Sequence, residues 1–167
     1  MLHKLNCYWC VLAINCTSDI VFVVNESRSI GSNNFARVKT FLSQIIRRLD
    51  IDSRNTRVGL VTYSTSARVR FYLSSHSSVA AVLSAISRLS YSGGSSNNIA
   101  AALSYVRRYM LTSSRGDRSN APNVIVVLTN GQSSNPSETQ VSTTLRLLLK
   151  SHISERLRTR SMLLIDA

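Results

Sequence analysis

Asp19-Ile-Val-Phe-Val-Val-Asn25-Glu-Ser27-Arg-Ser29 is an apolar run that ends in a polar turn rich in hydroxyl groups. Val124-Ile-Val-Val-Leu-Thr-Asn130-Gly131 has the same arrangement later in the chain. Continuous apolar runs of this length are typical of parallel strands buried on both faces, which deliver polar groups to the carboxyl edge of a sheet. Both turns carry asparagine where a metal site needs aspartate. The sequence therefore predicts the scaffold of an ion site without its negative charge.

Strand-like and helix-like segments alternate along the rest of the chain. Apolar residues recur at steps of three and four over residues 33–50, which predicts an amphipathic helix with Asn33 or Ser32 as its cap. Residues 68–73 alternate polar and apolar side chains, which is typical of a half-exposed edge strand reached by a tight turn. The other expected elements are helices over 79–89, 99–110 and 137–151, and strands over 56–64 and 160–165.

This alternation predicts a doubly wound α/β fold, with a mostly parallel sheet, one antiparallel edge strand and helices on both faces. Right-handed crossovers place the first strand beside the strand that ends at Thr129. Such sheets bind ligands beyond the carboxyl ends of their strands, at the point where the connections diverge. The groups expected to converge there are Asn25, Ser27, Ser29, Asn130 and the Gly-Ser loop over 90–96.

The composition fits one globular domain of 167 residues with a sizeable core, because 44% of the residues are hydrophobic and only two are proline. No apolar run is long enough to predict a membrane span. The net charge of +12 comes mainly from arginine, which pairs with flat anionic groups, although a merely solvated basic surface explains it equally well. The chain has no signature of nucleic-acid binding, and we expect none.

The first 18 residues differ from the rest and resemble a degraded signal peptide or leader, so the folded domain is expected over 19–167. They hold all three cysteines, and the spacing Cys7-Tyr-Trp-Cys10 lacks the strand and helix of a redox site, which favours coincidence. Asn15-Cys-Thr17 and Asn25-Glu-Ser27 are N-glycosylation sequons in a secreted chain. Whether either asparagine carries a glycan stays open.

Five segments, in order, resemble the von Willebrand factor type A domain of extracellular-matrix and collagen-associated proteins, from about Cys16 to Ile165. The family's metal-ion-dependent adhesion site reads Asp-x-Ser-x-Ser, to which a Gly-rich loop adds threonine and a Thr-Asp-Gly turn adds aspartate. Residues 25–29 match the first motif with asparagine for aspartate. Residues 93–98 resemble the Gly-rich loop and put Ser96 at the threonine position, and residues 129–131 match the last motif, again with asparagine.

The resemblance implies a divalent-cation site at Asn25, Ser27, Ser29, Ser96 and Asn130, a set that offers no carboxylate. A unit-charge pair about 4 Å apart is worth roughly 4 kcal/mol at an effective dielectric of 20, and a divalent ion doubles this. We therefore expect no cofactor, and at most weak binding of Mg²⁺ or Mn²⁺. Deamidation at Asn130-Gly would restore one carboxylate.

Glu26 is expected to face solvent rather than to replace the missing aspartate. The family usually continues with a sixth strand and a closing helix that often carries a cysteine. The resemblance thus implies a partner for Cys16 beyond Ala167, and a chain that is an incomplete domain of a larger multidomain protein.

We expect no enzyme, because the three histidines lie in unrelated segments with no nucleophile and carboxylate beside them. The first hypothesis is a secreted, extracellular interaction module that binds a matrix protein such as a collagen without a strong metal requirement. Its candidate partner contacts are Arg28, Ser95 and Asn97.

Three alternatives remain open. The chain could bind a sulfated polysaccharide through Arg47, Arg48, Arg107 and Arg108, be a weakly metal-dependent adhesion domain, or be a structural relic without a working site. The tripeptide Arg115-Gly116-Asp117 matches an integrin-recognition motif, but a three-residue match favours chance.

Overall fold

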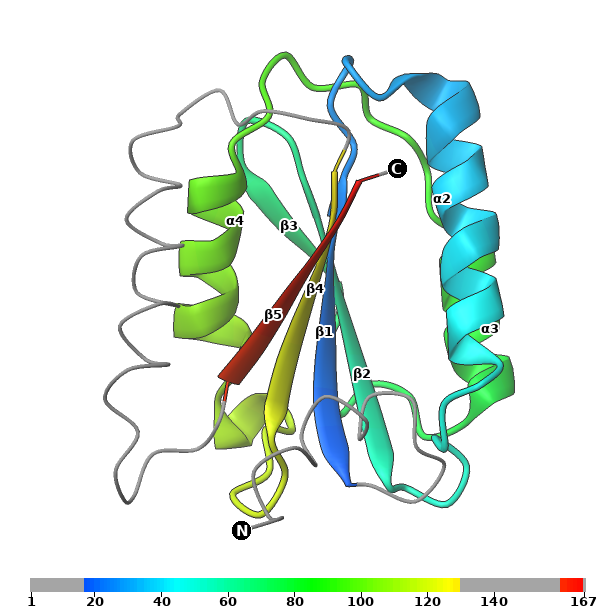
Figure 1. The fold of residues 1–167 in the computed structure, drawn as a ribbon, viewed down its shortest axis with the longest axis vertical. Coiled ribbons are helices and arrows are strands. Elements are labelled where there is room, and N and C mark those ends of the chain that lie inside the picture. Colours follow the sequence, from blue (N-terminus) through cyan, green and yellow to red (C-terminus); the bar gives the residue numbers. More distant parts are fainter. Residues whose placement is uncertain (1–16, 130–159, 167) are drawn as a thin grey trace, which may run out of the picture.

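The computed structural model describes residues 17–129 and the strand backbone of 160–166. These residues form a five-stranded sheet in the order β3-β2-β1-β4-β5, with helices on both faces (Figure 1). The strands are β1 (Ser18–Asn25), β2 (Thr56–Tyr63), β3 (Ala67–Phe71), β4 (Asn123–Thr129) and β5 (Arg160–Asp166). The helices are α2 (Gly31–Ile46), α3 (Val79–Ser87), α4 (Ile99–Tyr105), a π-helical turn η1 (Val106–Met110) and a 3₁₀ turn η2 (Ser113–Arg115).

The sheet pairing confirms the predicted architecture. Strand β1 pairs in parallel with β2 and β4, β4 pairs in parallel with β5, and β3 runs antiparallel to β2 at the edge. The predicted helix over 137–151 and most of the predicted leader, residues 1–16, lie outside the described residues. No helix in the described part of the chain is long and apolar enough to cross a membrane.

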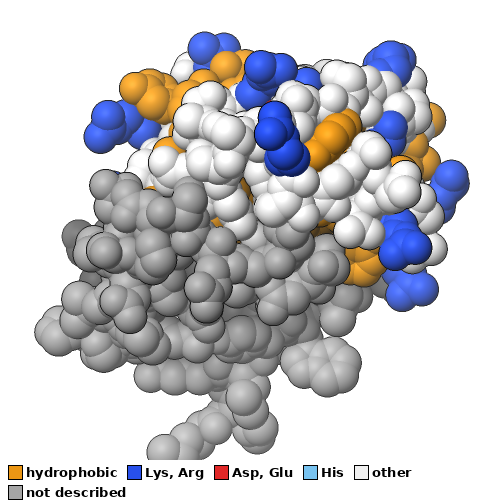
Figure 2. All heavy atoms as spheres, turned by 90° about the horizontal axis from the view of Figure 1, so that it is seen from above, with side chains coloured by type: hydrophobic (Ala, Val, Ile, Leu, Met, Phe, Trp, Pro, Cys, Tyr) orange, Lys and Arg blue, Asp and Glu red, His pale blue; other side chains and the backbone are white. Residues whose placement is uncertain are grey.

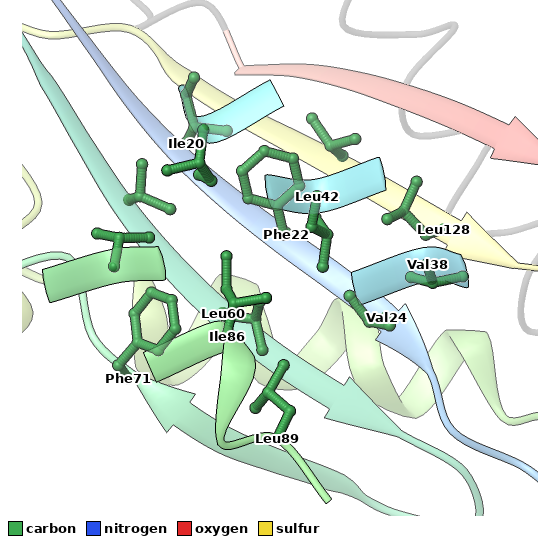
Figure 3. Packing of buried hydrophobic residues seen from close by; sticks show 14 of the residues in the cluster. Ile20, Phe22, Val24, Val38, Leu42, Leu60, Phe71, Ile86, Leu89 and Leu128 are labelled. Carbon is green, nitrogen blue, oxygen red and sulfur yellow. The ribbon is translucent and has the colours of Figure 1, made fainter. Parts of the chain in front are cut away.

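Two hydrophobic clusters cover the two faces of the sheet, because successive side chains of a strand point to opposite faces. Phe22 of β1 and Leu60 of β2 lie side by side and pack beneath α2 and α3, as Figure 3 shows. Val23 and Val61 point the other way and pack against α4 and η1. The central strands are therefore buried on both sides, and this explains their unbroken apolar sequences.

The predicted helix over 99–110 divides into α4 and the π-helical turn η1. Met110 is fully buried, and its methyl group lies against Gly59 of β2, where an added Cβ would come within 3.0 Å of it. The wider turn closes with a hydrogen bond from the Leu111 N–H to the Val106 carbonyl. The missing side chain of Gly59 thus leaves the space that receives Met110.

The predicted cap of the first helix is wrong. Helix α2 begins at Gly31, and the residue before it, Ile30, makes no capping bond through its side chain. Ile30 is instead buried, its N–H donates to the Ser27 carbonyl, and Gly31 adopts a φ of +73° that residues with a side chain rarely reach. A tight turn on a buried isoleucine therefore sets the start of the helix, in place of Asn33 or Ser32.

Arg118 joins the amino ends of the central strands. Its backbone N–H and Nε donate to the two carboxylate oxygens of Asp19 at 2.7 and 2.8 Å, and Asp19 is 0% exposed. The same guanidinium donates to the carbonyls of Ser18, Arg54 and Asn55. One side chain thus satisfies a buried carboxylate and holds β1 to the loop that leads into β2.

Replacing Arg118 with methionine should lower the free energy of unfolding by roughly 3–5 kcal/mol, because Asp19 stays buried without its counter-charge. Urea unfolding measures this loss. Arg108→Met is the matched control, since Arg108 is exposed in η1, and it should change stability by less than about 0.5 kcal/mol. Equal losses in the two variants would contradict the anchoring role of Arg118.

Candidate functional site

Three connections meet at the carboxyl end of the sheet. They are the loop from β1 to α2, the turn from β2 to β3, and the Gly-Ser loop, which in the structure continues from the predicted residues 90–96 to residue 98, just before α4. The Gly-Ser loop leaves α3 on one face, crosses the ends of β1 and β2, and enters α4 on the other face (Figure 1). Its last residue, Asn98, donates its N–H to the Ser64 carbonyl and caps α4 by accepting from the Ala101 N–H. The loop is thereby fixed at both the sheet and the helix.

Gly94 is the point at which these connections touch. It forms a β-bridge with Ser27, and its carbonyl accepts a hydrogen bond from the Arg28 N–H at 2.7 Å. A Cβ at this position would collide with the side chain of Ser64. Only glycine therefore allows the Gly-Ser loop to lie so close to β1 and β2, and the predicted convergence of the loop with residues 25–29 is confirmed.

The first motif folds into a compact polar turn. Asn25 is 0% exposed, and its Oδ1 accepts the Ser27 N–H at 2.8 Å. The hydroxyls of Ser27 and Ser29 lie 2.8 Å apart. Ser96, on the Gly-Ser loop, is half-buried. At the four predicted ligand positions that the structure describes, Asn25, Ser27, Ser29 and Ser96, the side-chain oxygens are therefore uncharged amide and hydroxyl oxygens. The fifth position, Asn130, lies outside the described residues.

Glu26 is buried, so the expectation that it faces solvent is wrong. Its Oε2 lies 2.6 Å from the Arg70 guanidinium, and the side chains of the two residues are 3% and 15% exposed. Arg70 also donates through Nε to the Thr62 hydroxyl at 2.8 Å. Within residues 17–129, the one carboxylate beside the predicted site therefore has an arginine partner.

A β-bulge puts Arg70 in this position. Leu60 of β2 is opposite Phe71 and Val61 is opposite Val69, so Arg70 is the extra residue of the bulge. Bulges redirect a side chain relative to the regular alternation of a strand. Sequence reasoning missed the pair because the alternation in residues 68–73 assigns no partner to Arg70, and no local signal marks the bulge.

The two ends of the sheet differ in charge. Within residues 17–129, every acid other than Glu26 lies towards the amino ends of the parallel strands; these acids are Asp19, Asp50, Asp52 and Asp117. Figure 2 views the carboxyl end, and its coloured side chains include Lys and Arg but no Asp or Glu. In the described part of the chain no three His, Cys, Asp or Glu side chains come together as metal ligands.

Three of the candidate partner contacts lie together in and beside the Gly-Ser loop. Arg28 is exposed beside Gly94, Ser95 is exposed with its hydroxyl 3.3 Å from that of Thr65, and Asn97 is almost fully buried. These three residues share the carboxyl end of the sheet with the first motif.

The four arginines predicted to bind a polysaccharide do not form one surface. Arg47 and Arg48 follow α2, which covers one face of the sheet. Arg107 and Arg108 belong to η1, which covers the opposite face. The sheet separates the two pairs.

The tripeptide Arg115-Gly116-Asp117 forms a packed turn. The Arg115 guanidinium lies over the Tyr72 ring, 4.3 Å from its centroid, and the Arg57 side chain donates to the Gly116 carbonyl at 2.9 Å. Gly116 is buried with a φ of +98°, and a Cβ there would meet the Ser74 nitrogen at 2.6 Å. These contacts give the tripeptide a structural role in the fold.

Tyr63 ends β2 beside Asn25, and its side chain is 0% exposed. Burial raises the pKa of Tyr63 to about 12, against a smaller opposing effect of the Thr129 hydroxyl. The phenol therefore stays neutral at physiological pH and adds no charge to this end of the sheet.

The raised pKa of Tyr63 predicts a pH-dependent stability. The unfolded tyrosine ionises near its ordinary pKa of about 10, so the contribution of Tyr63 is complete below that pH and is lost as the pH rises towards about 12. The loss should reach at most roughly 2–3 kcal/mol. Denaturant unfolding between these pH values should show a steeper decline in the natural chain than in Tyr63→Phe. Parallel declines would refute the assignment.

The family profile for the von Willebrand factor type A domain matches residues 19–154 of this chain. The chain is 42% identical to the collagen alpha-4(VI) chain of Mus musculus over 120 residues, which is 70% of this chain and 5% of that protein. It is 39% identical to matrilin-1 of Bos taurus over 119 residues, which is 69% of this chain and 22% of that protein. The chain thus matches only a small part of these matrix proteins.

Solved structures show the same fold. Proximal thread matrix protein 1 from the mussel byssus superimposes with a TM-score of 0.78 at 16% identity, over 92% of this chain and 38% of that one. Another structure of the mussel protein, with a zinc-occupied MIDAS motif, gives a TM-score of 0.76 at 17% identity. From the profile, the relatives and the sheet topology together, this chain belongs to the von Willebrand factor type A domain family.

Proposed function

We propose that the chain is an extracellular interaction module that binds a matrix protein, such as a collagen, at the carboxyl end of its sheet without a tightly bound divalent metal. Its relatives from extracellular matrix proteins support an adhesion or protein-interaction role and an extracellular location. Three features go beyond what the relatives support: a matrix protein such as a collagen as the partner, binding at the carboxyl end of the sheet, and binding without a metal ion.

The observation that carries the proposal is the lack of a free carboxylate among the described groups of the site. The Asn25 side chain is neutral, buried and bonded to the Ser27 N–H. Glu26 is paired with Arg70. Mg²⁺ is a hard cation that in proteins is held by one or two carboxylates, so these groups do not fit tight binding of that ion.

The loops nevertheless form a rigid surface. The Gly-Ser loop is bonded to the β1–α2 loop through Arg28 and Gly94, and to the β2–β3 turn through Ser64 and Asn98. A preformed surface loses little conformational entropy on binding, which favours affinity. The site therefore keeps the geometry of a docking surface although the charges of a metal site are missing.

Binding of the chain to immobilised collagen I, measured in EDTA and in Mg²⁺, tests this function. We expect the two dissociation constants to agree within about twofold, because no bridging ion is required. Ser95→Tyr, at the carboxyl end, should weaken binding at least about tenfold by obstructing the surface, and one decade corresponds to roughly 1.4 kcal/mol.

Ser77→Tyr is the matched control, since Ser77 is exposed in the loop ahead of α3 at the amino end of the sheet. It should bind as the natural chain does. Binding that disappears in EDTA would return a metal-dependent adhesion domain to first place. Absence of collagen binding under both conditions would reject the proposed partner, and equal losses in the two tyrosine variants would reject the proposed surface.

A further inference from the structure

We propose that the carboxyl end of the sheet binds a carboxylate of an acidic protein segment directly, through the guanidinium groups of Arg28 and Arg68. This inference rests on the proposed function and names the ligand chemistry of the same surface. It requires no metal ion, because the positive charge comes from the chain itself.

The two arginines lie on either side of the contact between Gly94 and Ser64, Arg28 in the β1–α2 loop and Arg68 in β3. Arg28 follows Ser27 in the first motif, and its N–H donates to the Gly94 carbonyl. Arg68 is in β3 opposite Thr62, close to the turn that contains Ser64, the residue that Gly94 contacts. Both cations thus lie at the carboxyl end of β1 and β2.

Both guanidinium groups are available for a ligand. Arg28 and Arg68 are exposed, and within the described residues neither side chain makes a hydrogen bond or an ion pair. Arg70 differs, because Glu26 already neutralises it. Arginine offers a planar fork of donors that matches a carboxylate bidentately, and such charge-assisted hydrogen bonds are stronger than neutral ones.

The charge around them selects anions. Within residues 17–129, the acids other than Glu26 lie towards the opposite end of the sheet, and Glu26 is buried in its ion pair. The backbone of Asp166, the last residue of β5, lies opposite Thr129 on the far side of β4 from β1. In Figure 2, which views the carboxyl end, no Asp or Glu side chain is visible among the coloured residues. A ligand carboxylate that approaches this end therefore meets two cations that no acid of residues 17–129 neutralises.

The arrangement favours an acidic protein segment over a sulfated polysaccharide. A polyanion gains affinity from a continuous row of cations, and each neutralised charge adds to the salt dependence of binding. Here the remaining arginines are dispersed, with Arg47 and Arg48 after α2 on one face and Arg107 and Arg108 in η1 on the other. Two cations at one end suit one or two carboxylates.

Fluorescence anisotropy of labelled peptides in EDTA tests the inference. The probes are an eight-repeat Glu-Gly peptide and the neutral Gln-Gly peptide of equal length. We expect the natural chain to bind the acidic peptide at least about tenfold more tightly, since charged hydrogen bonds contribute more than neutral ones. Arg28→Gln and Arg68→Gln should each weaken this binding about fivefold or more, and their combination should abolish the preference for glutamate.

The double variant Arg47→Gln/Arg48→Gln removes the same charge from the other end of the sheet and should leave the preference intact. An equal loss in that control, equal binding of the two peptides, or heparin binding that depends on Arg47 and Arg48 but not on Arg28 would each overturn the inference.

Collagen binding separates this inference from the proposed function. If the natural chain binds collagen I in EDTA and Arg28→Gln/Arg68→Gln binds equally well, the carboxylate site is refuted and the interaction module stands. If the natural chain fails to bind collagen but discriminates between the peptides through the two arginines, the partner is wrong and the carboxylate site stands.

Discussion

The ion pair between Glu26 and Arg70 determines the electrostatic character of the carboxyl end of the sheet. A buried carboxylate without a partner would be strongly destabilising, and it would also be a ready ligand for a cation. The β-bulge at Arg70 brings a guanidinium within 2.6 Å of Glu26 and removes both effects together. The remaining described groups of the site are neutral, so the exposed arginines dominate its potential.

The scaffold of the site does not depend on an ion. The Asn25 side chain holds the Ser27 N–H, the Gly94 carbonyl holds the Arg28 N–H, and the Gly-Ser loop is fixed to β2 through Ser64. Each of these bonds is internal to the protein and would form with either asparagine or aspartate at position 25. The geometry of these loops therefore does not depend on a charge at position 25.

The sequence was sufficient to predict a mostly parallel sheet, an antiparallel edge strand over 68–73 and the position of β1 beside β4, because continuous apolar runs favour buried parallel strands and strict alternation favours an edge strand. It was not sufficient for features that depend on contacts between distant residues. The Glu26–Arg70 pair needs a bulge, the π-helical turn needs the space above Gly59, and the start of α2 follows from the buried Ile30. None of these leaves a local pattern.

We propose that the missing carboxylates, and not a change in the loop geometry, keep this site from binding a divalent metal tightly. Calorimetric titration of Mg²⁺ and Mn²⁺ into the natural chain and into Asn25→Asp/Asn130→Asp tests it most directly, with Asn33→Asp/Asn120→Asp as a control of equal charge at exposed positions. We expect only Asn25→Asp/Asn130→Asp to bind these ions with a dissociation constant below roughly 1 mM. Binding of that strength by the natural chain would contradict it.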